Sequence, residues 1–307
     1  MFAIVRKELA DYVTSIRFVA SFLLVLLVST AGLWAANEGI RQASLPEGTV
    51  FLGLYTTSGT VIPSLTYLVS LLIPIIGIAL GFDAINSERD SGTLSRIMAQ
   101  PIFRDSVING KFLAGVVTLS IMVGTMLLLV AGYGLSMIGV PPSAEEIIRL
   151  FGYFIMIIVY GAFWMGLAIL FSIVFRRVAA SLLFSLALWL FFSIFILLIA
   201  PGIANALAPT ASGEQAELIR NAELQRMIMR FSPNVLFQEA TTVLLVPIVR
   251  SLGMVSTAQA TYMVPNPLSL GQSILLVWPH ITSLISLSAV CFAVSYILFM
   301  RQEIRAT

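Results

Sequence analysis

Six long stretches without Asp, Glu, Lys or Arg constrain this sequence more than any other feature. They cover residues 18–36, 62–82, 112–138, 152–175, 178–200 and 275–300. A bilayer core about 30 Å thick is crossed by a helix of roughly 20 apolar residues, so each stretch is long enough to span a membrane. The strands of a membrane barrel would alternate apolar and polar residues, and these stretches do not. The sequence therefore predicts an all-α integral membrane protein with six transmembrane helices.

The composition excludes several classes of protein. Hydrophobic residues make up 59% of the chain and charged residues 10%, whereas about 25% charged residues is usual in soluble domains. This leaves too little polar surface for a soluble enzyme. The net charge of +2 gives no reason to expect a nucleic-acid partner. Cys291 is the only cysteine, so neither an intrachain disulfide nor a thiolate metal cluster can form.

The distribution of Lys and Arg predicts the orientation in the membrane, because short cytoplasmic loops are usually the more basic ones. With the N-terminus inside, the short outer loops hold only Arg41 and Arg149. The inner segments then hold Arg6, Lys7, Arg17, Arg89, Arg96, Arg104, Lys111, Arg176, Arg177, Arg301 and Arg305. We therefore expect a multi-pass protein of the cell membrane with both termini in the cytoplasm. The first apolar stretch is too long for a typical signal peptide, and we expect it to be retained.

Residues 1–17 have the pattern of an amphipathic helix. Their apolar side chains recur at helical spacing at Val5, Leu9, Tyr12, Val13 and Ile16. Such a helix is expected to lie flat in the membrane interface, with its apolar side toward the acyl chains. The pattern predicts a separate elbow helix with a functional role, and the alternative is an ordinary amphipathic start to the first span.

The second span carries two features that affect packing. Gly77 and Gly81 are four residues apart, a spacing that allows another helix to approach closely. Pro63 and Pro74 interrupt the span, but prolines are tolerated where neighbouring helices satisfy the freed carbonyl groups.

The strongly charged segment 83–111 joins the second and third spans. We expect the second span to continue to Asp90 and to end at Gly92, because glycine permits the turn that a helix C-terminus needs. A further helix is expected to begin near Arg104 and to run into the third span.

Between these two helices the sequence predicts a short helix over residues 94–100. Thr93 can cap its N-terminus, and it must end before Pro101. Arg96 lies on one side of this helix, and the opposite side gathers Leu94, Ile97 and Met98. An exposed apolar face of this kind is typical of a docking site, although a packed connection between two spans would have the same composition.

Residues 201–274 form a long insertion outside the membrane. A capping-box pattern at Ser212 and Gln215 precedes a helix with one charged and one apolar face. The charged face holds Glu217, Arg220, Glu223 and Arg226, and the apolar face holds Leu224, Ile228 and Phe231. A serine followed by proline then begins a second helix, 234–246, which is apolar enough to lie on the outer surface. Part of 251–270 could instead dip into the bilayer.

Several catalytic signatures are absent from the sequence. It contains no phosphate-binding Gly-x-x-x-x-Gly-Lys loop, no His-Glu-x-x-His and no Gly-x-Ser-x-Gly. The single histidine, His280, is expected to be a hydrogen-bonded packing residue rather than a metal ligand, and its spacing from Met227 and Met229 does not support a metal site. Because no ionisable group lies well inside a span, ion-coupled transport is disfavoured and the energy source is expected to be elsewhere.

The order of residues between the second and third spans is distinctive. It reads Glu88-Arg89-Asp90-Ser91-Gly92-Thr93-Leu94, then Pro101, Arg104 and Gly110-Lys111. This order resembles the signature of ABC-2-type permeases, the membrane subunits of one class of ATP-binding-cassette transporters, which points to a prokaryotic source. The opening residues Arg6, Lys7, Glu8 and Leu9 resemble the start of that family's elbow helix.

The resemblance implies a single permease domain that is driven by a separate cytosolic ATPase. ATP and Mg²⁺ would bind that partner, and this chain would hold no cofactor. The ATPase would seat the short helix in a surface groove, so that its closure would move the second and third spans. The coupling residues that the resemblance implies are Glu88, Arg89, Gly92, Thr93, Leu94, Arg96, Ile97, Met98, Pro101 and Arg104. Glu88 and Arg89 would orient the short helix, while Arg96 and Arg104 would contact the ATPase or the elbow.

Six spans usually form half of such a transporter, so the resemblance also implies a homodimer or a pair with a related permease. The long outer insertion is similar to that of a subgroup that acts with partners outside the membrane. This subgroup includes the permease of the copper-site maturation system of nitrous-oxide reductase. We expect export of a hydrophobic or amphipathic substrate, or mechanical action on an outer protein. The alternatives are a secondary transporter or channel that needs no ATP, and a scaffold or sensor that transports nothing.

Overall fold

The computed structural model describes residues 1–42, 50–93, 103–139, 141–210, 215–249 and 267–302. Within these ranges the secondary structure is helical and contains no strand. In chain order the elements are α1 (Phe2–Thr14), α2 (Ile16–Gln42), α3 (Val50–Thr56), α4 (Leu65–Gly81), α5 (Asn86–Asp90), α7 (Arg104–Ile138), α8 (Ala144–Val174), α9 (Val178–Leu190), the π-helical turn η1 (Phe191–Phe195), α10 (Ile196–Leu207), α11 (Gln215–Met229), α12 (Pro233–Leu245) and α14 (Leu270–Arg301).

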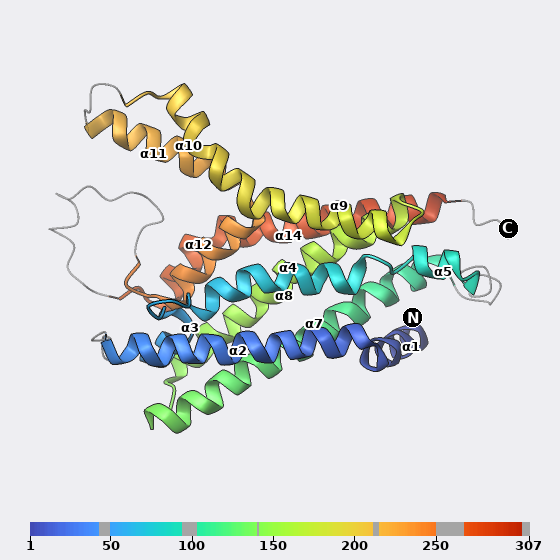
Figure 1. Ribbon diagram of the computed structural model, residues 1–307, viewed down its shortest axis with the longest axis horizontal. Helices are drawn as coiled ribbons and strands as arrows, with labels where there is room; N and C mark the ends of the chain where they lie inside the picture. Colours follow the sequence, from blue (N-terminus) through green and yellow to red (C-terminus); the bar gives the residue numbers. More distant parts are fainter. Residues whose placement is uncertain (43–49, 94–102, 140, 211–214, 250–266, 303–307) are drawn as a thin grey trace.

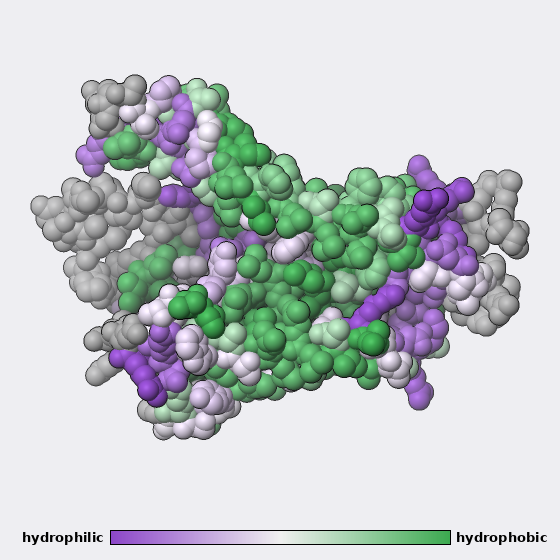
Figure 2. All heavy atoms as spheres, viewed as in Figure 1, coloured by the Kyte–Doolittle hydropathy of each residue, from purple (hydrophilic) through white to green (hydrophobic). Residues whose placement is uncertain are grey.

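Six helical segments are long and apolar enough to cross a membrane, as the sequence predicts. They are Ile16–Arg41, Leu65–Asp90, Arg104–Met137, Ala144–Val174, Val178–Leu207 and Leu270–Arg301. The surface of the bundle shows a broad apolar belt between two polar ends (Figure 2). Figure 1 places α1, α5 and the last residues of α14 at the same end of the bundle, which we call the terminal end, and α3 and α12 toward the opposite, far end.

The core is built around α8, which packs against α4 and α14. The two glycines of α4 make its contact with α8 close, as their spacing predicts. A Cβ atom at Gly77 would lie 2.7 Å from the carbonyl oxygen of Gly161, and one at Gly81 would lie 2.6 Å from that of Met165. Larger residues at either position would force the two helices apart.

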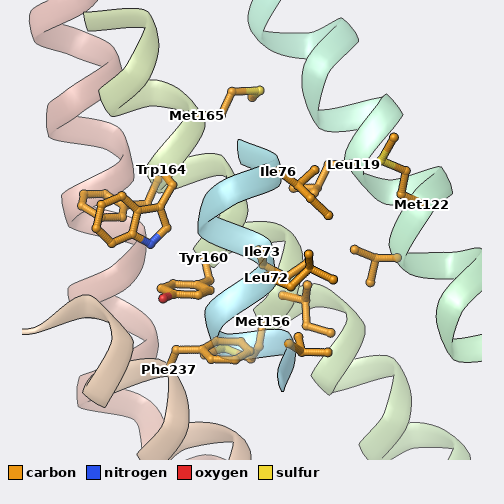
Figure 3. Packing of buried hydrophobic residues seen from close by; sticks show 14 of the residues in the cluster. Leu72, Ile73, Ile76, Leu119, Met122, Met156, Tyr160, Trp164, Met165 and Phe237 are labelled. Carbon is orange, nitrogen blue, oxygen red and sulfur yellow. The ribbon is translucent and has the colours of Figure 1, made fainter. Parts of the chain in front are cut away.

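An aromatic cluster fills the space between α8 and α12 (Figure 3). The ring of Tyr160 stacks on that of Phe237 with centroids 4.4 Å apart, and Trp164 meets Tyr160 edge to face at 6.4 Å. All three side chains are fully buried. Each such ring pair adds about 1 kcal/mol beyond the area it buries, so α12 is held firmly against the centre of α8.

The burial of α12 differs from the prediction that this helix lies on the outer surface. Its N-terminus is as expected, with Ser232 as the cap and Pro233 in the first turn. The helix packs against α14, α8 and α4, however, and most of its side chains are buried. The prediction was wrong because an apolar helix fits a membrane surface as well as a bundle core, and the sequence does not show which of the two it meets.

The fifth span continues beyond the bundle. Helix α9, the turn η1 and α10 follow one another, and α10 then pairs with α11 to form an arm that projects past the far end (Figure 1). The amide of Asn221 joins the two helices by donating to Asn205 Oδ1 at 2.7 Å and to the carbonyl of Ala208 at 2.8 Å. The predicted capping serine, Ser212, lies outside the described residues, as does most of the segment 251–270 that could enter the bilayer.

Candidate coupling site at the terminal end

Helix α1 is separate from α2, because Ser15 between them adopts an extended backbone conformation. It packs along α7, where Ile4 covers Gly110, and the side chains of Ile4 and Val5 are buried there. Part of the predicted apolar stripe points elsewhere, since Ile16 is 83% exposed. The chain therefore has the separate helix expected of an elbow, and its position flat in a membrane interface stays a prediction.

A cluster of ion pairs joins α1 to α5 and α7. Lys111 of α7 donates to Glu8 of α1 at 3.0 Å and to Glu88 of α5 at 2.8 Å. Lys7 also reaches both carboxylates, at 3.0 Å from Glu8 and 3.3 Å from Glu88. The side chains of Lys111 and Glu8 are only 5% and 9% exposed. Removing one member would leave a buried charge without its partner and would destabilise the contact between the three helices.

Lys7 remains a cation in this cluster. Partial burial would lower its pKa, but the neighbouring carboxylates of Glu8, Glu88 and Asp11 outweigh that effect and raise the pKa above its ordinary value. Arg6 is exposed and Leu9 is half-buried on the same helix. Of the four predicted elbow residues, Lys7 and Glu8 therefore enter the ion-pair cluster.

Two further contacts fix the end of α4. Tyr12 of α1 donates its hydroxyl to the carbonyl of Leu80 at 2.9 Å, and burial raises the pKa of this phenol, which keeps it a donor. Arg17 of α2 pairs with Asp83, and its guanidinium lies 4.9 Å from the centre of the Phe82 ring. Helix α1 thus contacts the last turn of α4, and the first turn of α2 contacts the turn that follows α4.

That turn, residues 82–85, interrupts the helix that the sequence predicts to continue to Asp90. Ser172 Oγ of α8 accepts from the amide of Ile85, at the end of the turn, at 2.9 Å and from that of Asn86, the first residue of α5, at 3.1 Å. The helix then restarts as α5. This tertiary contact stabilises the restart of the helix, and the local sequence gives no sign of it.

The expected break after Asp90 is confirmed. Gly92 has a φ of +68°, a left-handed conformation that favours glycine. Thr93 directs its hydroxyl back to the carbonyl of Glu88 at 3.3 Å. The predicted short helix and its side chains lie outside the described residues, and these are Leu94, Arg96, Ile97, Met98 and Pro101.

Gln302, just after α14, connects three of these elements and was not predicted. Arg89 of α5 donates to its side-chain oxygen at 2.5 Å, and Arg104, at the start of α7, donates to its backbone carbonyl at 3.1 Å. Its own amide donates to the carbonyl of Ile173 at 2.9 Å. Both arginines thus bond to the end of α14, and a single glutamine after an apolar helix gives no sequence signal for this role.

The far end holds a different kind of polar contact. Arg149 is 1% exposed and donates to the carbonyls of Leu244 and Leu268, at 2.8 and 2.7 Å, and to Ser273 Oγ at 3.1 Å. It therefore ties α8 to both ends of the segment between α12 and α14. The sequence places Arg149 in a short outer loop, because it lies just before the charge-free stretch 152–175. The burial of this side chain in the second turn of α8 was therefore missed.

His280 has the packing role expected from the sequence. It is buried, and its Nε2 lies 2.7 Å from Glu239 of α12, which also accepts from Arg230 at 2.8 Å. In the part of the chain that the structure describes, no three His, Cys, Asp or Glu side chains are grouped as metal ligands would be.

Comparison with known proteins agrees with this arrangement. The profile of the ABC-2 family transporter proteins matches residues 2–304. The chain is 29% identical over 187 residues to the probable ABC transporter permease protein NosY of Pseudomonas aeruginosa, covering 59% of this chain and 58% of that protein. It is 33% identical over 145 residues to the protein of the same name from Stutzerimonas stutzeri, covering 44% of this chain and 48% of that one. The chain thus matches about half the length of each of these relatives. A match over nearly its whole length places this chain in the ABC-2 family of transporter proteins.

Proposed function

We propose that this chain is the membrane subunit of an ATP-driven transporter and that a separate cytosolic ATPase acts on its terminal end. The observation that carries the proposal is the ion-pair cluster of Lys111, Glu8 and Glu88. These residues lie on α7, α1 and α5, and α5 and α7 flank the segment 94–102 and carry most residues of the family signature. A push on that segment would reach the two helices on either side of it and the elbow together.

The packing of the bundle gives a path for such a motion. Helix α5 follows α4 after one turn, and α4 is locked to α8 through Gly77 and Gly81. Helix α8 in turn holds α12 through the stacked rings of Tyr160 and Phe237. Because these contacts are close and mostly apolar, displacement of α4 would be transmitted to the far end rather than absorbed.

The partners follow from surfaces that the single chain leaves exposed. In the spans Val178–Leu207 and Leu270–Arg301, only 17% of the most apolar stretch is buried, which suits contact with lipid and with a second permease copy. Helix α11 of the arm exposes Leu218 and Met227, and Phe231 is exposed in the turn that follows it. This arm suits an outer protein partner, and the work done is either export of an amphipathic substrate or movement of that partner.

Purification from native membranes tests the ATPase partner. The tagged wild-type chain is expected to bring down Mg-ATP hydrolysis activity. The triple variant Leu94→Asp, Ile97→Asp and Met98→Asp should reduce the recovered activity by about 10-fold, as loss of a central apolar anchor does. The matched control is Leu218→Asp, Met227→Asp and Phe231→Asp, on α11 and in the turn after it, which should retain the activity. If the wild-type chain is purified without ATPase activity and transports its substrate in ATP-free vesicles that hold an ion gradient, it is instead a secondary transporter.

Cysteine labelling tests the orientation. In a Cys291→Ser background, Thr93→Cys should be protected from a membrane-impermeant maleimide added to intact cells, and it should react after lysis. Leu218→Cys on the exposed arm should react in intact cells. Reaction of Thr93→Cys from outside would place the signature segment on the wrong side for a cytosolic ATPase and would refute the proposal.

A further inference from the structure

The arm of α10 and α11 is attached to the bundle at its base. In the part of the chain that the structure describes, α10 packs mainly on α11 and η1, and α11 packs mainly on α10, whereas the helices of the bundle pack extensively on one another. The hydrogen bonds of Asn221 to Asn205 and Ala208 hold the two helices of the arm together. The arm is therefore one hairpin, and its orientation is decided where α10 leaves η1 and where α11 ends in the turn 230–232.

The first of these connections is the π-helical turn η1. Such a turn interrupts the regular hydrogen bonds of an α-helix and bends the helix axis. The axis of the fifth span bends in this region, between α9 and α10 (Figure 1). The hydroxyl of Ser232, in the turn 230–232, donates to the carbonyl of Phe192 in η1 at 2.7 Å. The two ends of the arm thus meet at η1, which places the bend at the root of the hairpin.

The second connection is made by three polar side chains, which we call the base latch: Arg230, Glu239 and His280. Arg230, in the turn 230–232, donates its Nε–H to Glu239 Oε2 at 2.8 Å, and Nε2 of His280 lies 2.7 Å from the same oxygen. Partial burial would raise the pKa of Glu239, but the hydrogen bonds from His280 and Arg230 outweigh that effect and lower the pKa. Glu239 therefore remains an anion, and it ties the end of the arm to α12 and α14.

We infer that the arm turns on η1 as one rigid body and that the base latch fixes one of its orientations. The three residues of the latch belong to the end of the arm, to α12 and to α14. A shift of α12 against α14 would separate Glu239 from Arg230 or His280 and would release the arm. Because the arm is held at its base, a small shift there becomes a larger displacement of the exposed surface of α11. The inference goes beyond the proposed function, because neither the pivot nor the latch requires an ATPase.

Distances between paired spin labels on the purified full-length chain test the pivot and the latch. In a Cys291→Ser background, the pair Leu128→Cys and Leu218→Cys reports on the arm relative to the bundle. The pair Ile199→Cys and Leu218→Cys lies within the arm, and the pair Leu128→Cys and Leu183→Cys lies within the bundle. All four labelled positions are exposed. In the wild type, all three pairs should give narrow distance distributions.

Arg230→Met removes the side of the latch that belongs to the arm. Because Arg230 is 35% exposed and Glu239 keeps its contact with His280, the bundle should remain folded. The arm–bundle distribution should become about 2-fold wider, as expected when a second orientation is populated, and the other two pairs should keep their widths. Arg230→Lys, which keeps the charge, should preserve the narrow distribution. Arg220→Met, on the exposed side of α11, is the control and should also preserve it.

The label pairs that widen locate the pivot. Widening confined to the arm–bundle pair places it between residues 183 and 199, the part of the fifth span that contains η1. Equal widening within the arm would show that α10 and α11 separate, and equal widening within the bundle would show general loosening. Either result would overturn the rigid pivot.

Two results would overturn the latch. The first is an unchanged arm–bundle distribution in Arg230→Met. The second comes from Glu239→Gln, which weakens the same contact from the side of α12. Added to Arg230→Met, it should widen the distribution no further, because the contact is already lost. Additive widening would show that the two residues act separately and do not form one latch.

Discussion

The two ends of this bundle are held together in different ways. At the terminal end, Lys111, Glu8 and Glu88 make side-chain ion pairs between α7, α1 and α5. At the far end, the buried cation Arg149 pairs with the exposed carboxylate of Glu145 and also donates to the backbone carbonyls of Leu244 and Leu268. Side-chain pairs can rearrange when the helices shift, whereas bonds to backbone carbonyls fix the path of the chain. The difference suits a molecule that is moved at one end and keeps its geometry at the other.

The largest expected effect is on the terminal end. Lys111→Met leaves the buried carboxylates of Glu8 and Glu88 without their main partner and should lower the free energy of unfolding by about 4 kcal/mol. The measurement is denaturant unfolding in micelles. Adding Glu8→Gln and Glu88→Gln to Lys111→Met should restore at least half of the loss, because neutral groups no longer repel each other. If the neutral triple variant is as unstable as Lys111→Met, unpaired charge is not the cause.

The corresponding change at the far end should not be rescued in this way. Arg149→Met removes the donor to two buried carbonyls and should cost about 3 kcal/mol. Its acidic partner Glu145 is 56% exposed, so Glu145→Gln in the same chain should restore almost nothing. Arg220→Met, on the exposed side of α11, is the control and should be nearly neutral. Rescue by Glu145→Gln would show that the two ends are held alike.

The seam between α4 and α8 connects the two ends. Gly81→Ala places a methyl group 2.6 Å from the carbonyl oxygen of Met165 and should cost about 2 kcal/mol through overpacking. Gly132→Ala in α7, where the added carbon meets nothing within 4 Å, should be neutral or slightly stabilising. Equal stability of the two alanine variants would mean that the seam yields easily and transmits little motion.

Sequence reasoning located the spans better than the contacts between them. The six apolar stretches, the close seam at Gly77 and Gly81, and the turn at Gly92 follow from local residues, and the structure confirms them. Residues such as Glu8 and Lys111 were singled out separately, but their meeting depends on how α1 crosses α7. A pattern within one helix carries no information about that crossing.

The same reason explains what sequence reasoning missed at the far end. Helix α12 was placed on the outer surface because its apolar side chains fit a membrane interface as well as a bundle core. From the sequence alone Arg149 resembles a loop cation, because its contacts with carbonyl groups depend on where α12 and the start of α14 lie. Gln302 likewise has no local signal. In each case a tertiary neighbour decides the role.

The smallest expected effect on the free energy of unfolding is that of Ser172→Ala, which should change local motion more than stability. Ser172→Ala removes the acceptor for the amides of Ile85 and Asn86 and should cost only about 1 kcal/mol. Hydrogen exchange of residues 82–90 should nevertheless become faster, because the turn between α4 and α5 loses its contact with α8. Ser136→Ala, which removes a hydroxyl that bonds only within its own helix, should change neither. If exchange in 82–90 stays slow in Ser172→Ala, the ion pairs of Glu88 suffice to hold this turn, and α4 and α5 then respond to a push as one rigid rod.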